Sequence, residues 1–509
     1  MNEFGSQRVG EVVRGDTRQE QIVQIGLARR SFLRMVGSAA LGGSLLSVGP
    51  LRHAAAGGAS AHAGPGTRYK PTVRVAFVRR KGPYGMRWPG AVYDGDAALA
   101  RYREKITHTA RELGMVASLR EEPIHSQAEA EQWANEAEAA APDGLLVVLL
   151  DRQEHAWPTA ARAADTHIPT VVFCPIGAAF TTNTKELAAR SGLFICSTDD
   201  FAQVAYGMKM LWAGAKLREM RFVVLRGDQR SETTLDHLGT KVRYVPASDF
   251  LEQYRRTPLS DDVKKLATYY LDRPRRDGVA PSDEDIYNGI KSYVVARQIL
   301  EREDGDGISM DCLGALGRTD VSLPCIAWSR MLDDGIPAAC EADLGACATH
   351  ALIQFLFDRP GFQQDPVPET ARECLIGAHC TCPTRLNGFV ADPEPFVMSH
   401  HHGLRDAVPV PRWRPGQRMT SADIVFRPPL EQGGTEVKQA PQLIVSSGIV
   451  VDNVSVPPAG GCVVSVMVKF DGVKDYLAYP GFHQVFFYGD YKKELAAYSR
   501  LFDLELEMV

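Results

Sequence analysis

The stretch Gly144-Leu145-Leu146-Val147-Val148-Leu149-Leu150 decides the fold class of this chain. It carries no polar side chain, so a strand formed from it must be buried on both faces. Strands of that kind are typical of parallel sheets, because helices cover both faces of such a sheet. The stretch therefore predicts an α/β domain built on a parallel sheet.

The segments around this strand alternate between strand and helix patterns. Three further apolar runs are typical of buried strands, at residues 73–78, 115–119 and 168–173. Two segments have helical periodicity, at residues 97–113 and 126–141. Gly114 provides a stop for the first helix, and Ser126 is a favoured N-cap for the second. This order predicts a Rossmann-like domain over residues 64–196.

A second unit of the same kind follows. Its helical patterns lie at residues 201–216, 261–271, 283–301 and 345–356. Its strand patterns lie at residues 222–227 and 242–245, and residues 321–327 are predicted to be a strand or a loop. We expect a second Rossmann-like domain over residues 197–358.

The last third of the chain has a different character, with short apolar runs separated by Pro, Gly and Asp. Strand patterns lie at residues 422–426, 442–448, 461–468 and 484–489, and residues 490–502 have a helical pattern. Such spacing predicts an antiparallel sandwich or barrel over residues 359–509. The expected fold class is thus two Rossmann-like parallel α/β domains followed by a C-terminal antiparallel β-rich domain.

Residues 1–63 differ from the rest of the chain. Arg29-Arg30 is followed by Phe32-Leu33 and then by an uncharged, moderately apolar stretch. Ala61-His62-Ala63 then offers small residues at the −3 and −1 positions of a cleavage site. This order predicts a twin-arginine signal peptide and export to the periplasm or cell envelope. The alternative is a disordered basic tail, which would leave the protein in the cytoplasm.

The composition excludes several classes of protein. The chain of 509 residues is 45% apolar and 23% charged, as globular proteins are, and its formal net charge is −5. It has no long run of Lys and Arg, so nucleic acid is not an expected partner. No segment after the leader has the roughly 20 apolar residues of a membrane-spanning helix, so no membrane span is expected in the mature chain.

The ten cysteines allow two interpretations. An even number permits disulfides in an exported protein. Most of these cysteines lie in apolar segments, however, which favours buried free thiols. Cys380-Thr381-Cys382 is a C-x-C motif and therefore lacks the spacing of a zinc ribbon.

Acidic residues and histidines in the C-terminal half are the candidates for chemistry. Glu341 lies between an apolar strand-like stretch and the start of a helix, where α/β domains place ligand-binding groups. Asp365 follows it in the chain and precedes Pro366. Further along the chain are the single histidines His379 and His483 and the triplet His400–His402.

Two carboxylates and an imidazole on separate elements can hold a hard divalent metal ion with open positions. Each residue also has a structural interpretation. Glu341 can complement a helix dipole, Asp365 before a proline can be a turn residue, and the histidine triplet can be a solvated loop. The residues alone leave these alternatives open.

The chain resembles the L-fucose isomerase-like family, which has the L-fucose/L-arabinose isomerase fold. The segment Cys340-Glu341-Ala342-Asp343 is similar to a motif of that family. The order of elements near the C-terminus is also similar to that of the family. A strand ends in Lys469-Phe470-Asp471, a histidine follows, and a second strand reaches Tyr488-Gly489-Asp490. The resemblance covers about residues 71–509 and is clearest over residues 336–389 and 459–490.

The resemblance implies a fold, a cofactor and an activity. Members have two Rossmann-like domains and a β-rich domain, form homo-oligomers, and bind Mn²⁺ through a Glu, an Asp and a late His. By motif these ligands correspond to Glu341, Asp365 and His483, and Mg²⁺ or another divalent cation is an alternative to Mn²⁺. The implied reaction is aldose–ketose isomerisation of a small sugar through an ene-diol, with Glu341 and Asp365 as the acid–base pair.

Three further residues are candidates for binding the sugar. They are His379, His402 and Trp88, the last of which can alternatively be a surface aromatic. Two other functions remain open from the sequence. One is a periplasmic, non-enzymatic carbohydrate-binding protein, because two α/β domains with a cleft also describe solute binders. The other is a different metal-dependent enzyme that acts on a polyol or sugar acid.

Overall fold

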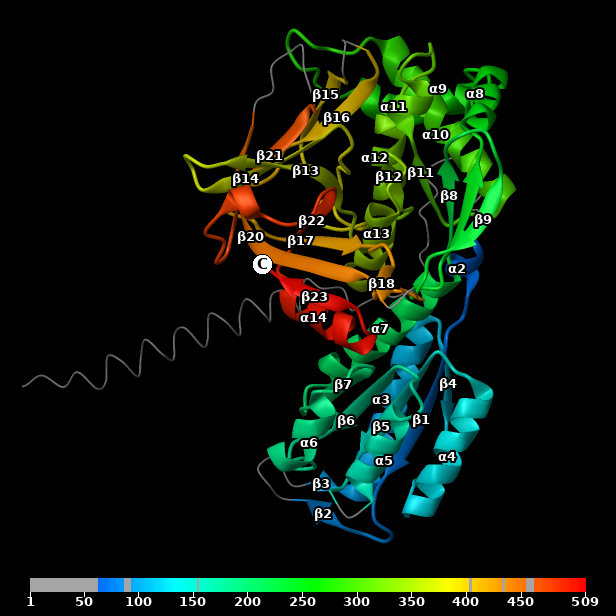
Figure 1. Cartoon of the computed structure of the whole chain (residues 1–509), viewed down its shortest axis with the longest axis vertical. Coiled ribbons are helices and arrows are strands. Elements are labelled where there is room, and N and C mark those ends of the chain that lie inside the picture. Colours follow the sequence, from blue (N-terminus) through cyan, green and yellow to red (C-terminus); the bar gives the residue numbers. More distant parts are fainter. Residues whose placement is uncertain (1–62, 87–92, 153–154, 402–404, 433–434, 455–461) are drawn as a thin grey trace, which may run out of the picture. The chain divides into compact units, whose positions relative to one another are not determined.

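The computed structural model describes residues 63–86, 93–152, 155–401, 405–432, 435–454 and 462–509. Apart from Ala63, the predicted leader lies outside these residues, as do Trp88 and His402. The chain forms two parallel α/β sheets followed by a closed antiparallel barrel (Figure 1), which confirms the predicted fold class. No helix in the described ranges has the length and apolar character needed to cross a bilayer.

The first sheet is entirely parallel and has the strand order β4-β1-β5-β6-β7. Its strands are β1 (Thr72–Val78), β4 (Val116–Leu119), β5 (Gly144–Leu149), β6 (Thr170–Cys174) and β7 (Leu193–Ser197). The accompanying helices are α2 (Pro65–Arg68), α3 (Gly95–Leu113), α4 (Gln127–Ala140), α5 (Ala156–Ala164) and α6 (Thr181–Ala188), and β2 (Gly85–Met86) pairs with β3 (Tyr93–Asp94).

The sequence signals in this region act as predicted. Every residue of β5 is buried, as its apolar composition requires. Ser126 caps α4 by accepting a hydrogen bond from the Glu129 N–H, and Gly114 ends α3 in the left-handed conformation. Helices α4 and α5 cover one face, where Trp133 and Trp157 pack in one cluster with alternate residues of β1 and β5.

The second sheet has the order β12-β11-β8-β10-β9, and only its edge strand β9 is antiparallel. Its strands are β8 (Arg221–Leu225), β9 (Ser231–Thr234), β10 (Lys241–Val245), β11 (Gly307–Met310) and β12 (Ala338–Cys340). Helix α7 (Phe201–Glu219) precedes this sheet in the chain and packs against β6 and β7 of the first sheet and against α13. The helices that follow are α8 (Ala247–Arg256), α9 (Asp261–Leu271), α10 (Asp283–Glu303), α11 (Cys312–Leu316), α12 (Cys325–Asp333) and α13 (Leu344–Phe357).

One prediction in this region is wrong in part. Residues 321–327 are predicted to be a strand or a loop; residues 321–324 are a loop, but α12 begins at Cys325. Pro324 directly precedes this helix, and the fixed φ of proline suits the start of a helix as well as a turn. The end of the apolar run is therefore buried as the first turn of a helix.

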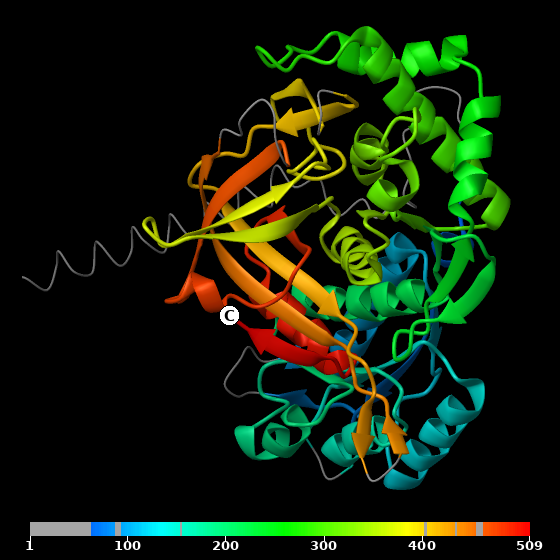
Figure 2. The same ribbon diagram turned by 45° about the horizontal axis from the view of Figure 1, so that its top comes forward.

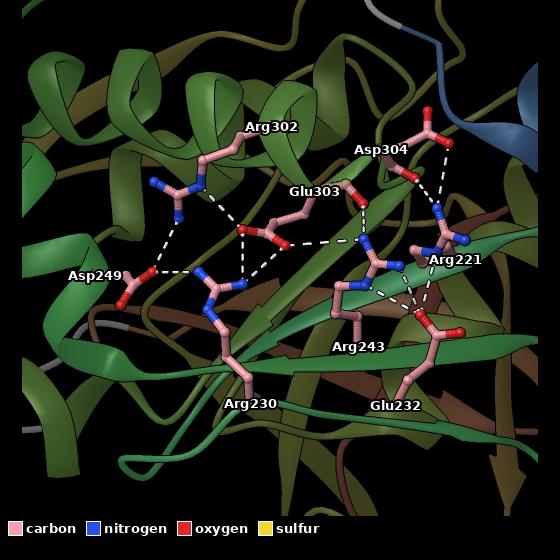
Figure 3. Close-up of polar contacts among 8 residues, drawn as sticks. All are labelled: Arg221, Arg230, Glu232, Arg243, Asp249, Arg302, Glu303 and Asp304. Atoms are coloured by element: carbon pink, nitrogen blue, oxygen red, sulfur yellow. Dashed lines mark hydrogen bonds and ion pairs between the residues drawn. The ribbon is translucent and has the colours of Figure 1, made fainter.

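Charged residues join the outer strands of this sheet to the end of α10. Four arginines and four acidic residues form what we call the arginine network (Figure 3): Arg221, Arg230, Arg243, Arg302, Glu232, Asp249, Glu303 and Asp304. The carboxylate of Glu303 is buried and accepts hydrogen bonds from Arg230 Nη1 at 3.0 Å and Arg302 Nε at 2.9 Å. Arg68 pairs with Asp304 as well, so each carboxylate of the network has at least two arginine partners.

The C-terminal barrel closes through six strands in the order β17-β22-β13-β14-β21-β20, with β20 paired back to β17. These strands run from yellow to red in Figure 2. They are β13 (Phe362–Glu369), β14 (Cys374–His379), β17 (Arg418–Val425), β20 (Gln442–Asn453), β21 (Val464–Phe470) and β22 (Gln484–Tyr488). Outside the closed ring are β15 (Phe396–His400), β16 (Ala407–Pro411), β18 (Leu430–Gln432), β19 (Thr435–Val437), β23 (Glu505–Met508) and α14 (Lys492–Leu501).

The second sheet and the barrel share one hydrophobic core. Residues of β8 and β11, such as Val223 and Ile308, belong to the same buried cluster as Phe362 and Phe486 of the barrel. Helix α13 packs against β17 and β22. The carboxyl end of β12 is thereby held next to the barrel strands.

Candidate active site

The turn between β12 and α13 carries the first predicted site residue, Glu341. Glu341 and Ala342 have φ values of 62° and 56°, so two consecutive non-glycine residues are left-handed. Each such residue costs about 1–2 kcal/mol. Asp343 then caps α13, because its Oδ1 accepts a hydrogen bond from the Ala346 N–H at 2.8 Å. Asp343, and not Glu341, is thus the acidic residue that complements the dipole of α13 at its N-terminus. The side chain of Glu341 is 41% exposed.

Asp365 lies within strand β13, where it pairs with Ala378 of β14. The alternative prediction that Asp365 is a turn residue is therefore wrong. The neighbouring Gln363 ties this strand to the end of β12, since its side-chain oxygen accepts a hydrogen bond from the Cys340 N–H at 2.9 Å. Asp365 is in this way fixed next to the turn that carries Glu341.

His483 brings these groups together from the segment before β22. Its Nδ1 lies 2.9 Å from Oδ2 of Asp343. Its Nε2 lies 3.2 Å from Oδ1 of Asp365 and 3.5 Å from Oε2 of Glu341. His483 is itself left-handed, with φ of 55°, and its side chain is only 6% exposed. Three residues that are distant in sequence therefore meet at one ring nitrogen, and we call Glu341, Asp343, Asp365 and His483 the carboxylate site.

His379 borders the carboxylate site at the end of β14. Its Nε2 lies 3.8 Å from Oε1 of Glu341, and its Nδ1 lies 3.5 Å from Sγ of Cys380. The ligand atoms of Glu341, His379 and His483 all lie within 4.8 Å of one another. The predicted sugar-binding residue His379 is thus next to the predicted metal ligands.

Two predicted sugar-binding residues cannot be placed relative to this site. Trp88 and His402 lie outside the described residues. His400 contacts Asp285 of α10 at 3.3 Å, and His401 lies with Cys325 and Cys380. The histidine triplet is therefore no single ligand cluster in the part that the structure describes.

The carboxylate site has an excess of negative charge. Burial disfavours the imidazolium of His483, but its contacts with Asp343 and Asp365 outweigh this and raise its pKa to about 10. Three carboxylates thus face one cationic ring. Among the described residues, no Lys or Arg forms an ion pair with Glu341, Asp343 or Asp365.

The residue types at this site suit a hard divalent cation; Glu341, His379 and His483 form the group whose ligand atoms lie within 4.8 Å of one another, and Asp365 joins it through its contact with His483. His483 Nε2 and Asp365 Oδ1 are both buried and lack a hydrogen-bond partner of good geometry. Neighbouring ligands of an octahedral ion with bonds of about 2.1 Å lie about 3 Å apart, and the 3.2 and 3.5 Å separations are close to this value. Asp343 orients the ring through Nδ1, as carboxylates do behind metal-binding histidines.

Sequence reasoning missed two acidic residues at this site. Asp343 lies in the motif that drew attention to Glu341, and its place immediately before a predicted helix is the signal for an N-cap. Asp423 lies in β17, where burial first and the charge of Asp343 second raise its pKa to about 7. No local pattern marks Asp423, because only the closed barrel brings β17 near the start of α13.

Comparison with known proteins adds no assignment. No family model matches the sequence, and no curated protein is similar to it.

Proposed function

We propose that this protein is a metal-dependent aldose–ketose isomerase that acts on a small sugar through an ene-diol. One observation carries the proposal. The side chains of Glu341 and Asp365 point at the same nitrogen of His483, and no described Lys or Arg pairs with them. Carboxylates that outnumber the cationic groups around them favour binding of a divalent metal ion.

The candidate ligands for that ion are Glu341, Asp365 and His483. They combine two oxygen donors with one imidazole, which suits Mn²⁺ and also permits Mg²⁺. When bound, a divalent cation supplies Lewis-acid polarisation of the sugar carbonyl. The exposed side of Glu341 leaves room for substrate oxygens.

The side chains of the chain itself have three tasks in this proposal. Asp343 holds the His483 ring with Nε2 turned toward Asp365 and Glu341. Glu341 and Asp365 move a proton between C1 and C2 of the sugar, one as base and the other as acid. His379, with Nε2 3.8 Å from Glu341 Oε1, is positioned to donate a hydrogen bond to a substrate hydroxyl.

Backbone strain at this site supports the same proposal. Glu341, Ala342 and His483 are all left-handed without being glycine. Residues in such conformations concentrate at functional sites, because the surrounding fold must hold them there. Membership of the L-fucose isomerase-like family, export through the leader and assembly into a homo-oligomer belong to the same proposal.

The test is a direct assay. The purified full-length chain is incubated with Mn²⁺ and a panel of pentoses and hexoses in D₂O, and interconversion is followed by NMR. We expect at least one aldose–ketose pair to interconvert with deuterium incorporated at C1 or C2. Tight sugar binding without turnover would support the carbohydrate-binding alternative and overturn the isomerase proposal. Conversion that is unaffected by chelation would overturn the role of the metal.

A further inference from the structure

A second group of metal-ligating side chains lies behind the carboxylate site. We call it the thiol cluster, and its members are Cys312, Cys325, Cys340, Cys380 and His401. Each of these side chains is at most 6% exposed. All four cysteines are free thiols. The cluster is therefore a buried, sulfur-rich site distinct from the exposed carboxylates.

Cys380 is the centre of this cluster. The ligand atoms of Cys325, Cys380 and His401 lie within 4.8 Å of one another, and so do those of Cys340, Cys380 and His379. The thiols of Cys340 and Cys312 also interact electrostatically. A buried cysteine usually behaves as a small apolar residue, and such residues pack among aliphatic side chains. Here the thiols instead pack against one another and against imidazole rings.

Regular elements hold these residues in place. Cys312 begins α11 directly after β11, and Cys325 begins α12. Cys340 ends β12, Cys380 follows β14, and His401 follows β15. Five elements from the second sheet and the barrel region thus converge, which gives the cluster a fixed geometry.

The two sites use neighbouring residues of the same strand ends. Cys340 precedes Glu341, and His379 precedes Cys380. Cys340 is the last residue of β12 and its thiol is buried, whereas Glu341 begins the following turn and its side chain is 41% exposed. His379 joins the two sides, since its Nδ1 faces Cys380 at 3.5 Å and its Nε2 faces Glu341 at 3.8 Å.

The chemistry of the donors separates the two sites. Thiolate and imidazole ligands select soft or borderline ions such as Zn²⁺, whereas carboxylates suit Mg²⁺ and Mn²⁺. Structural zinc sites commonly combine three cysteines with one histidine in a closed tetrahedron. In the thiol cluster, the ligand atoms of two cysteines and one histidine (Cys325, Cys380 and His401) lie within 4.8 Å of one another, without the short sequence spacing of a zinc ribbon.

We propose that the thiol cluster is a structural site for a thiophilic metal ion, held by Cys325, Cys380 and His401. The ion braces the strand ends that carry Glu341 and His379. This inference does not depend on isomerase activity, because the proposed site is defined by its own ligands.

The test uses the full-length chain with Zn²⁺ and with Co²⁺ as a spectroscopic probe. We expect about one zinc ion per chain bound through sulfur, and a sulfur-to-cobalt charge-transfer band after exchange. Cys380→Ser and Cys325→Ser should lose this band. Cys196→Ser removes a buried thiol of β7, outside the thiol cluster, and Glu341→Gln changes only the carboxylate site, so both should retain the band.

X-ray absorption at the zinc edge of the unmodified protein gives a second measurement that does not depend on any variant folding. Sulfur neighbours at about 2.3 Å support the proposal. A zinc ion with only oxygen and nitrogen neighbours overturns it, as does a protein that binds no zinc under reducing conditions. A disulfide between two cysteines of the cluster in the purified protein also overturns it.

Discussion

The arginine network and the carboxylate site both crowd acidic side chains around the second sheet, but they compensate the charge differently. In the network, Glu303 is buried between the guanidinium groups of Arg230 and Arg302 (Figure 3). At the carboxylate site, the ion-pair partners of Glu341 and Asp365 among the described residues are imidazole rings. The carboxylates of the network are paired with arginines, whereas three carboxylates share the one cationic ring of His483.

The partners of the carboxylates distinguish a structural cluster of acids from a functional one. A buried carboxylate with two arginine partners stabilises the fold, and removing it leaves cations unpaired. A cluster of carboxylates that repel one another lowers stability until a cation binds.

The largest effect concerns catalysis. Glu341→Gln keeps the shape of the side chain but removes a proton acceptor, so we expect the isomerisation rate to fall about a thousandfold. Glu303→Gln makes the same chemical change within the arginine network and should leave the rate at saturating substrate within about twofold of the unmodified protein. The rates are measured by NMR on the sugar that responds in the panel. Equal losses in the two variants would contradict the contrast.

The second effect is stabilisation by the metal. At a Mn²⁺ concentration a hundredfold above its dissociation constant, we expect the folded protein to gain about 2.7 kcal/mol, measured by thermal unfolding. Asp365→Asn removes a proposed ligand and should abolish most of this gain. Glu369→Gln lies on the same strand, β13, and should retain it. A gain that survives in Asp365→Asn would place the ion elsewhere.

The third effect is a difference in stability without metal. Glu303→Gln should lower the free energy of unfolding by about 2 kcal/mol, because it weakens charged hydrogen bonds to Arg230 and Arg302. Glu341→Gln should leave this free energy unchanged or raise it by about 0.5 kcal/mol, because a repulsive charge is removed. Urea denaturation in the presence of a chelator measures both. A larger loss for Glu341→Gln would reverse the comparison.

The smallest effect is the pH dependence of the stability that Glu303 contributes. Burial opposes ionisation of Glu303, but hydrogen bonds from Arg302 and Arg230 prevail and lower its pKa from the ordinary value of 4.5. A carboxylate with a lowered pKa contributes stability above the unfolded value and loses it as pH falls through the folded value. The stability gap between the unmodified protein and Glu303→Gln should therefore be full near neutral pH and shrink below about pH 4.5. A gap that widens in acid would contradict this assignment.

Most regular elements were predictable because their signals are local. The apolar run of β5 and the caps Ser126 and Gly114 act within a few residues. Strand β13 was harder to predict, since it contains Pro366 and Pro368. These prolines lie beyond Gln364, the last residue of β13 that pairs with β22, so the missing N–H groups interrupt no ladder on that side.

The candidate site was predictable only in part. Glu341 was identified from its motif, whereas the roles of Asp343 and Asp423 depend on contacts that form when the barrel meets the second sheet. The thiol cluster had no sequence signal at all. Its cysteines are irregularly spaced along the chain, and their convergence requires five elements to be in place. Long-range packing, which no local pattern encodes, determines these features.

The most direct measurement is a crystal structure of the full-length chain grown with Mn²⁺, with anomalous scattering recorded at the manganese edge. We expect an anomalous peak from an ion bound by Glu341, Asp365 and Nε2 of His483, with Asp343 still in contact with Nδ1 of His483. A protein saturated with Mn²⁺ that shows its peak elsewhere, or no peak between these three side chains, would contradict it.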